Sequence, residues 1–183
     1  MAGSLPALFE VTGVAAGDML NIRDAPMAGA GLVGTFRPDA RGVEVVGTSA
    51  DRKWGLVNAG EGHGYVALRF LARQPGPDWF ALQAPLTCSG TEPFWTLAFD
   101  PALPVAVYRT PDVQASFTVQ ARWPGQARQP VAGLALGTNR FLNLQPAICS
   151  DGMTDRQFGI AALLFLQGGT GPVTLSGCCT RQP

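Results

Sequence analysis

The stretch "FGIAALLFLQGGTGPVTLSGCC", residues 158–179, decides the fold class of this chain. Its apolar run, residues 160–166, has a length that suits either a short buried helix or a central β-strand. Gly159 before the run and Gly168-Gly169 after it favour the strand, because glycine bounds short strands and is unfavourable within helices. The segment after the glycines has the composition of a second strand. The sequence therefore predicts an all-β protein.

The composition of the whole chain agrees with many short strands. The 23 glycines and 15 prolines make about a fifth of the 183 residues, which exceeds the usual share of roughly 12% and predicts frequent turns. Thirteen basic side chains balance thirteen acidic ones, so nucleic acid and anionic membranes are not expected as partners. The longest apolar run is about half the length of a membrane-spanning helix, and we expect no transmembrane segment.

Residues 8–71 divide into short apolar segments separated by turn signals, and the chain resumes this pattern after residue 79. The first group is LFEVTGV, MLNIRDAP, GLVGTF, GVEVVGT, KWGLVNAG and HGYVALRFL. The second group is WFALQ, FWTLAF, VAVYRT, ASFTVQAR, VAGLAL, RFLNLQ, FGIAALLFLQ and GPVTLSGCC. Five or six closely spaced strands predict one small barrel, and about eight more predict a second, closed or nearly closed antiparallel barrel.

The stretch "ARQPGPDW", residues 72–79, separates the two groups. It contains two prolines and a glycine and has no apolar periodicity, which is typical of a stiff linker. We therefore expect two domains, residues 1–74 and 75–183, each a small antiparallel β-barrel.

The four cysteines, Cys88, Cys149, Cys178 and Cys179, all lie in the second domain, and no C-x-x-C pair suggests a metal site. We expect neither a metal nor a cofactor. The adjacent pair is about 3.8 Å apart between Cα atoms, too close for a relaxed disulfide, so each is expected to bridge to Cys88 or Cys149 in an order that the spacing leaves open. One bridge would lie inside the barrel and the other outside, because neighbouring side chains on a strand face opposite ways. Paired cysteines indicate an oxidising compartment, and we expect an exported, periplasmic protein whose signal peptide has been removed.

A series of residues in the first domain follows the order and spacing of a known family. They are Leu20-Asn21-Ile22-Arg23, Pro26, Leu32-Val33-Gly34, residues 42–46, Trp54, Val57, Gly64-Tyr65-Val66 and Leu71. The segment resembles a bacterial SH3-like domain, with Tyr65 where a tryptophan is common. This resemblance implies a small barrel used in envelope proteins as a targeting or binding module, sometimes for peptidoglycan peptides. Arg23, Trp54 and Tyr65 would then line a ligand groove; alternatively, Trp54 fills the core and Arg23 pairs on the surface.

Three motifs mark the second domain: "CSGTEPFW", "CSDGMTDR" and the terminal "GCC", between residues 86 and 179. In this order they resemble a family of uncharacterised bacterial envelope proteins, many of them lipoproteins. The general layout is also similar to small periplasmic barrels such as the lysozyme-inhibitor and META-type domains. That similarity concerns the fold and implies no activity.

Glu92, within the first of these motifs, has three interpretations. It is a catalytic acid, a ligand-binding group, or an acceptor of hydrogen bonds from the backbone or Arg156 that fixes the turn before a strand. A hydrolase would require Glu92 to meet Asp151 or Asp155 in one open pocket. The sole histidine, His63, lies in the other domain in a glycine-rich hairpin and is expected to be a solvated turn residue.

The motif "CSDGMTDR" is expected to form a loop pinned by a disulfide. Asp151 before Gly152 is a turn signal, Asp155 and Arg156 are candidates for an ion pair, and the alternating ligands of a calcium loop are absent from the motif. Loops on a rigid barrel are a usual place for binding residues. The candidate ligand-binding residues of this domain are Glu92, Trp95, Asp151, Met153, Asp155 and Arg156.

The sequence thus predicts a non-enzymatic binding protein of the cell envelope. Its SH3-like module would bind peptidoglycan or a peptide of an envelope protein, and its second barrel would be an interaction domain whose ligand the residues do not identify. The alternatives are a hydrolase that uses the three carboxylates, and a purely structural tandem of barrels. The oligomeric state is left open.

Overall fold

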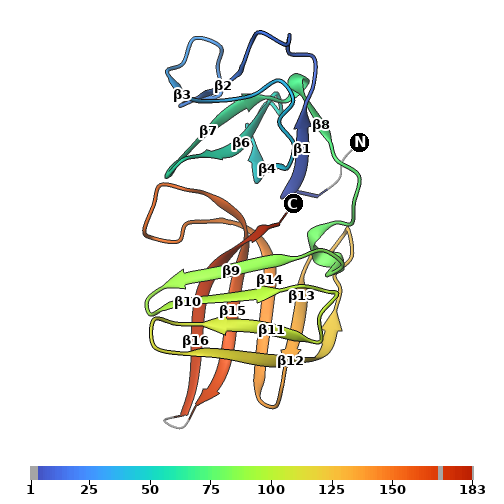
Figure 1. Cartoon of the computed structure of the whole chain (residues 1–183), viewed down its shortest axis with the longest axis vertical. Helices are drawn as coiled ribbons and strands as arrows, with labels where there is room; N and C mark the ends of the chain where they lie inside the picture. Colours follow the sequence, from blue (N-terminus) through green and yellow to red (C-terminus); the bar gives the residue numbers. More distant parts are fainter. Residues whose placement is uncertain (1–3, 169–170, 183) are drawn as a thin grey trace.

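The structure is a computed structural model that describes residues 4–168 and 171–182. Within these residues the chain forms sixteen β-strands and two 3₁₀ helices. The predicted all-β class is confirmed. Figure 1 shows the N-terminal half above a barrel formed by the C-terminal half.

The N-terminal half contains two hydrogen-bonded sheets around one apolar core. The first has the order β4-β1-β8 and the second β3-β2-β7-β6-β5. Their bounds are β1 (Ala7–Val11), β2 (Leu20–Arg23), β3 (Leu32–Phe36), β4 (Val43–Val45), β5 (Gly47–Thr48), β6 (Trp54–Ala59), β7 (Gly62–Ala67) and β8 (Leu71–Arg73), with a 3₁₀ helix, η1 (Leu68–Phe70), before the last. Neither sheet is closed by hydrogen bonds. A closed first barrel is therefore not confirmed, and the SH3-like assignment stays a prediction.

The C-terminal half is a closed antiparallel barrel of eight strands in the order β10-β11-β12-β13-β14-β15-β16-β9. Each strand pairs with the next along the chain, and β9 pairs with β16 to close the ring (Figure 1). The bounds are β9 (Leu86–Thr91), β10 (Phe94–Phe99), β11 (Val105–Arg109), β12 (Gln114–Trp123), β13 (Ala132–Leu136), β14 (Arg140–Cys149), β15 (Phe158–Gly168) and β16 (Gly171–Arg181). The predicted barrel is confirmed.

One predicted strand of this half is wrong and another was missed. The segment "WFALQ" contains a 3₁₀ helix, η2 (Trp79–Ala81), because Trp79 and Phe80 are both buried and a turn can bury neighbours that a strand would place on opposite faces. Strand β9 was missed, although its buried positions alternate with partly buried ones. The predicted linker is also shorter than residues 72–79, since β8 takes its start and η2 its end.

The two disulfides are Cys88–Cys179 and Cys149–Cys178. Cys88 and Cys179 face each other across the β9–β16 pair and belong to the barrel core. Cys178 points the other way and bridges to Cys149 at the end of β14. The expectation of one bridge inside the barrel and one outside is confirmed.

Hydrogen bonds join the two halves at several points. The Glu44 carboxylate on β4 accepts bonds from the Thr180 hydroxyl at 2.6 Å and from the Arg181 backbone N–H at 2.9 Å. The Trp79 indole donates to the Leu5 carbonyl at 3.2 Å. These contacts fasten the end of β16 and the start of the barrel segment to the N-terminal sheets.

Glu44 is expected to make this junction pH-dependent. Burial raises the pKa of Glu44, although the bonds from Thr180 and the Arg181 backbone and the charges of Arg181 and Arg156 act in the opposite direction. The folded protein therefore holds this proton more tightly than the unfolded chain, and the stabilisation by Glu44 is complete below its ordinary pKa of 4.5 and is lost as pH rises through the raised pKa.

The variant Glu44→Gln tests this, because its amide can accept from the Arg181 backbone and donate to the Thr180 hydroxyl without a charge. We expect the free energy of unfolding of the wild type to fall relative to that of the variant as pH rises from below 4.5. Urea unfolding at a series of pH values measures the difference. Parallel pH profiles would contradict a raised pKa.

Candidate functional site

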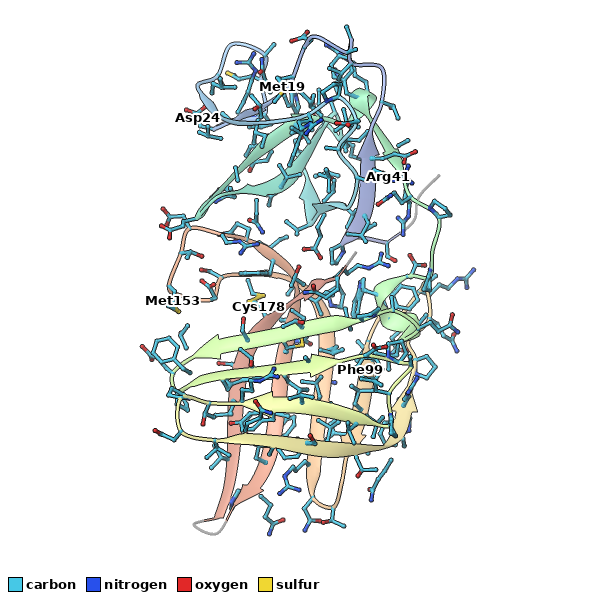
Figure 2. All side chains as sticks on the ribbon, viewed as in Figure 1. Met19, Asp24, Arg41, Phe99, Met153 and Cys178 are labelled. Atoms are coloured by element: carbon cyan, nitrogen blue, oxygen red, sulfur yellow. A yellow bond between two sulfur atoms is a disulfide. The ribbon has the colours of Figure 1, made fainter. Side chains whose placement is uncertain are left out.

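A groove with a volume of about 480 Å³ lies in the N-terminal half. It is lined by Gly13, Val14, Ala15, Asp18, Met19, Leu20, Asn21, Arg23, Ala28, Trp54, Ala67, Arg69 and Phe70. Two of the three residues predicted for a ligand groove, Arg23 and Trp54, are among them. Figure 2 shows Met19, one of these lining residues, at the end of this half that is distant from the barrel, and no described residue of the barrel lines the groove.

Strand register explains why Arg23 and Trp54 share one surface. Arg23 of β2 lies opposite Tyr65 of β7, and Trp54 of β6 lies opposite Ala67 of β7. Because positions 65 and 67 are two apart, their side chains and those of their cross-strand partners point to the same face. Tyr65 is on this face but does not line the groove.

The structure places Trp54 outside the apolar core cluster and pairs Arg23 with a backbone carbonyl rather than with an acidic side chain. Trp54 is partly buried and is not a member of the apolar core cluster formed by the described residues of this half. The Arg23 guanidinium donates through Nη1 to the Ala30 carbonyl at 2.7 Å, and it has no acidic partner within the described chain. This bond orders the loop before β3 and leaves the other guanidinium nitrogens for the groove.

The groove combines aromatic surface with charge. The Arg69 guanidinium lies over the Phe70 ring at 4.7 Å, a cation–π contact. Arg23 and Arg69 supply two guanidinium groups, and Asp18 supplies one carboxylate. Such a surface can stack on an apolar or planar group while its arginines bind a carboxylate through paired hydrogen bonds.

A second candidate site lies where the barrel meets the loop of residues 150–157, which follows the disulfide-bonded Cys149. A pocket of about 470 Å³ there is lined by Glu92, Gln145, Asp151 and the Cys149–Cys178 bridge, among others. A neighbouring pocket of about 400 Å³ is lined by Phe94, Trp95, Arg109 and Met153, among others. Gly90, Thr91 and Asp151 line both pockets, so the two form one continuous surface.

Glu92 is exposed in the turn between β9 and β10. Within the described residues its carboxylate has no hydrogen-bond donor and no ion-pair partner, and Arg156 does not reach it. The interpretation of Glu92 as an acceptor that fixes the turn is therefore wrong. Its carboxylate is free to contact a ligand.

Asp151 has the structural role that was expected of Glu92. Its carboxylate accepts hydrogen bonds from the backbone N–H groups of Met153 and Thr154, both at 3.1 Å, and from the Thr154 hydroxyl. Burial alone would raise the pKa of Asp151, but these bonds and the nearby charge of Arg156 outweigh it and lower the pKa. Asp151 is thus a charged residue that holds the loop and is poorly suited to act as a general acid.

Asp155 lies outside both pockets, and its backbone contacts the other domain. Its carbonyl accepts a 2.6 Å hydrogen bond from His63 Nδ1, which must carry the proton. The expected Asp155–Arg156 ion pair does not occur in the part of the chain that the structure describes. Arg156 instead lies 5.6 Å from the Phe158 ring centroid. The expectation for His63 is also wrong, because it is a residue of β7 that binds the loop.

Trp95 lines the neighbouring pocket but is too deeply buried to be an exposed ligand-binding residue. It is 2% exposed, belongs to the barrel core and donates from its indole nitrogen to the Ser176 carbonyl at 3.2 Å. A Cβ at Gly90 or Gly177 would collide with this ring and with the carbonyls of Ser176 and Ser89, which explains both glycines. Met153, in contrast, is exposed at the tip of the loop (Figure 2).

Sequence reasoning missed Asn58, which fixes the loop to the N-terminal half. Its side-chain amide donates to the Gln157 carbonyl and accepts from the Gln157 N–H, both at 2.9 Å. Asn58 and His63 are a cross-strand pair in the β6–β7 hairpin. Their contacts reach 99 and 92 residues along the chain, and local periodicity carries no signal for such pairs.

Replacing Asn58 by alanine is expected to loosen the loop without unfolding the barrel. Two hydrogen bonds, each with a net value of about 1 kcal/mol, hold Gln157, so its amide should exchange with solvent roughly tenfold faster or more. Amide exchange followed by NMR measures this, with the buried Leu164 amide on β15 as the internal control. Equal acceleration at both amides, or none at Gln157, would contradict the proposed role.

No group of three or more histidine, cysteine or acidic side chains that could hold a metal ion occurs in residues 4–168 and 171–182. No helix in that same part of the chain is long and apolar enough to span a membrane. Comparisons with protein-family models, curated proteins and solved structures find no match for this chain. The interpretation of both surfaces therefore rests on their geometry.

Proposed function

We propose that this protein binds a ligand in the bacterial cell envelope, and that its N-terminal half is an SH3-like module whose groove takes a peptide of peptidoglycan or of an envelope protein. The observation that carries the proposal is that Arg23 and Trp54, named from the SH3-like pattern, line one groove. A peptide with an apolar side chain and a free carboxylate matches the aromatic surface and the two guanidinium groups.

Two further observations support this proposal. None of the described barrel residues lines the groove, and its Met19 lies at the end of the N-terminal half that is distant from the barrel (Figure 2). The contacts between the halves use other residues, among them Glu44, Asn58 and His63. The two disulfides are compatible with export to an oxidising compartment.

The barrel is proposed to be a second interaction domain, with the exposed Glu92 and Met153 beside its two pockets. The alternative of a hydrolase is less well supported. Glu92 and Asp151 share a pocket, but the Asp151 carboxylate is occupied by loop donors, and Asp155 lies outside the pocket. A pair that divides acid and base roles needs one carboxyl with a raised pKa, and the pKa of Asp151 is lowered.

Co-sedimentation of the oxidised full chain with purified peptidoglycan sacculi tests the proposal. We expect saturable binding that Trp54→Ala weakens about tenfold or more, since aromatic anchors and arginines dominate such contacts. Trp123→Ala is the matched control, because Trp123 is a tryptophan of the barrel that is 51% exposed and lies outside the groove.

The outcomes separate the hypotheses. Absence of binding by the wild type would overturn peptidoglycan as the ligand. Equal weakening by both tryptophan variants would overturn the groove as the site. A loss of stability in Trp54→Ala without a loss of binding would overturn the groove as the site and give Trp54 a structural role.

A further inference from the structure

Arg181 is a buried guanidinium without a carboxylate partner. It is the last residue of β16 and is 8% exposed. Its Nη2 donates to the Pro77 carbonyl at 3.0 Å, and its buried Nε has no partner. No acidic oxygen within the described residues forms an ion pair with it. Buried charges are ordinarily paired with an opposite charge. Arg181 lacks such a partner within the described chain, and its Nε–H is left as a donor for a further acceptor.

The neighbouring acids are committed to other groups. The Glu44 carboxylate accepts hydrogen bonds from the Arg181 backbone N–H and the Thr180 hydroxyl. Asp78 forms an ion pair with Arg73 at 2.7 Å. Neither carboxylate therefore neutralises the Arg181 side chain by direct contact.

Arg181 lines a pocket of about 430 Å³ between the two halves, together with Leu8, Arg41, Gly42, Gln74 and Pro75. Arg41 lies beside β1 (Figure 2) and pairs at 2.8 Å with Glu10, which does not line the pocket. The Gln74 side chain accepts from the Gly42 N–H at 3.0 Å, which leaves its NH₂ group as a donor. The charged groups in the lining are thus two guanidinium groups, and no acidic residue is among them.

We propose that this pocket binds a small oxyanion, a carboxylate or a phosphate, with Arg181 and Arg41 as its cationic partners. The planar guanidinium donates two parallel hydrogen bonds to either group. An anion bound here would contact the N-terminal sheets and the last barrel strand together. The site is separate from the groove of Arg23 and Trp54, and the proposal does not depend on the proposed function.

The experiment is an NMR titration of the full oxidised chain at constant ionic strength, with acetate in one arm and inorganic phosphate in the other. The signals followed are the Nε–H of Arg181 and the side-chain NH₂ of Gln74. We expect both to shift saturably, with a dissociation constant in the millimolar range for at least one anion. The anion with the lower dissociation constant shows whether the pocket prefers a carboxylate or a phosphate.

Variants provide the specificity control. Arg41→Gln is expected to weaken binding about fivefold, since a largely exposed charged contact contributes about 1 kcal/mol. Arg37→Gln is the matched control, because Arg37 is an exposed arginine paired with Asp39 outside the pocket, and it should leave binding unchanged. Arg181→Lys keeps the charge and should bind more weakly than the wild type. Absence of a saturable shift in both arms, or equal weakening by Arg37→Gln and Arg41→Gln, would overturn the proposal.

Discussion

Replacing Cys88 and Cys179 together by alanine is expected to lower the free energy of unfolding by about 4 to 5 kcal/mol. The bridge joins residues 91 positions apart, so its loss frees a long loop in the unfolded chain. Each cysteine is 1% exposed, and the pair lies across the seam where β9 meets β16. Guanidinium unfolding without reductant measures the change.

The outer bridge is the matched control for this prediction. Cys149 and Cys178 are 29 positions apart, and the same chain-entropy argument gives a loss of about 3 to 4 kcal/mol when both are replaced by alanine. The loop of residues 150–157 should also become mobile in that variant, because the bridge anchors Cys149, the residue directly before it. A greater loss of stability from the outer pair than from the inner pair would contradict loop length as the main cause.

Trp95→Ala is expected to destabilise the protein by about 3 to 5 kcal/mol, as is usual for a buried tryptophan. The substitution removes a core side chain of the barrel and leaves the Ser176 carbonyl without its indole donor. Trp95→Phe keeps most of the apolar contact and should cost about 1 to 3 kcal/mol, mainly from that carbonyl. Urea unfolding compares the variants at one pH.

Phe94 is the control for Trp95, because it is adjacent in sequence, lines the same pocket and is 50% exposed. Phe94→Ala should change the free energy of unfolding by less than about 1 kcal/mol. If Trp95→Ala were equally mild, Trp95 would not be part of the core and its interpretation as a ligand-binding residue would regain support.

The strands were predictable because most of their signals are local. Strand β15 follows from an apolar run between glycines, and all of the expected N-terminal segments contain strands. The two errors, a strand predicted where η2 lies and the missed strand β9, have a physical cause. "WFALQ" is strongly apolar but buries two neighbours in a turn. "LTCSGT" buries Leu86, Cys88 and Gly90, and because two of these three residues are small, the segment has few large apolar side chains.

The sites were less predictable than the strands. Arg23 and Trp54 could be named because a pattern of residues pointed to a shared surface, but closure of the first half depends on hydrogen bonds between strands that local sequence does not define. The sequence could not show that Asp151, and not Glu92, accepts the hydrogen bonds that hold a loop, since both are acidic residues of motif loops. Only the folded loop shows that Thr154 reaches Asp151, and only domain packing brings Asn58 to Gln157.

The pairing of the first and last barrel strands determines when this domain can be completed during synthesis. Until the ribosome has made residues 171–181, β9 and β15 each present an edge without their β16 partner. Because Cys178 and Cys179 belong to that final strand, neither bridge can form earlier. The nascent barrel therefore stays an open sheet until its last strand is made, and a chain truncated before β16 would be exposed to aggregation and proteolysis.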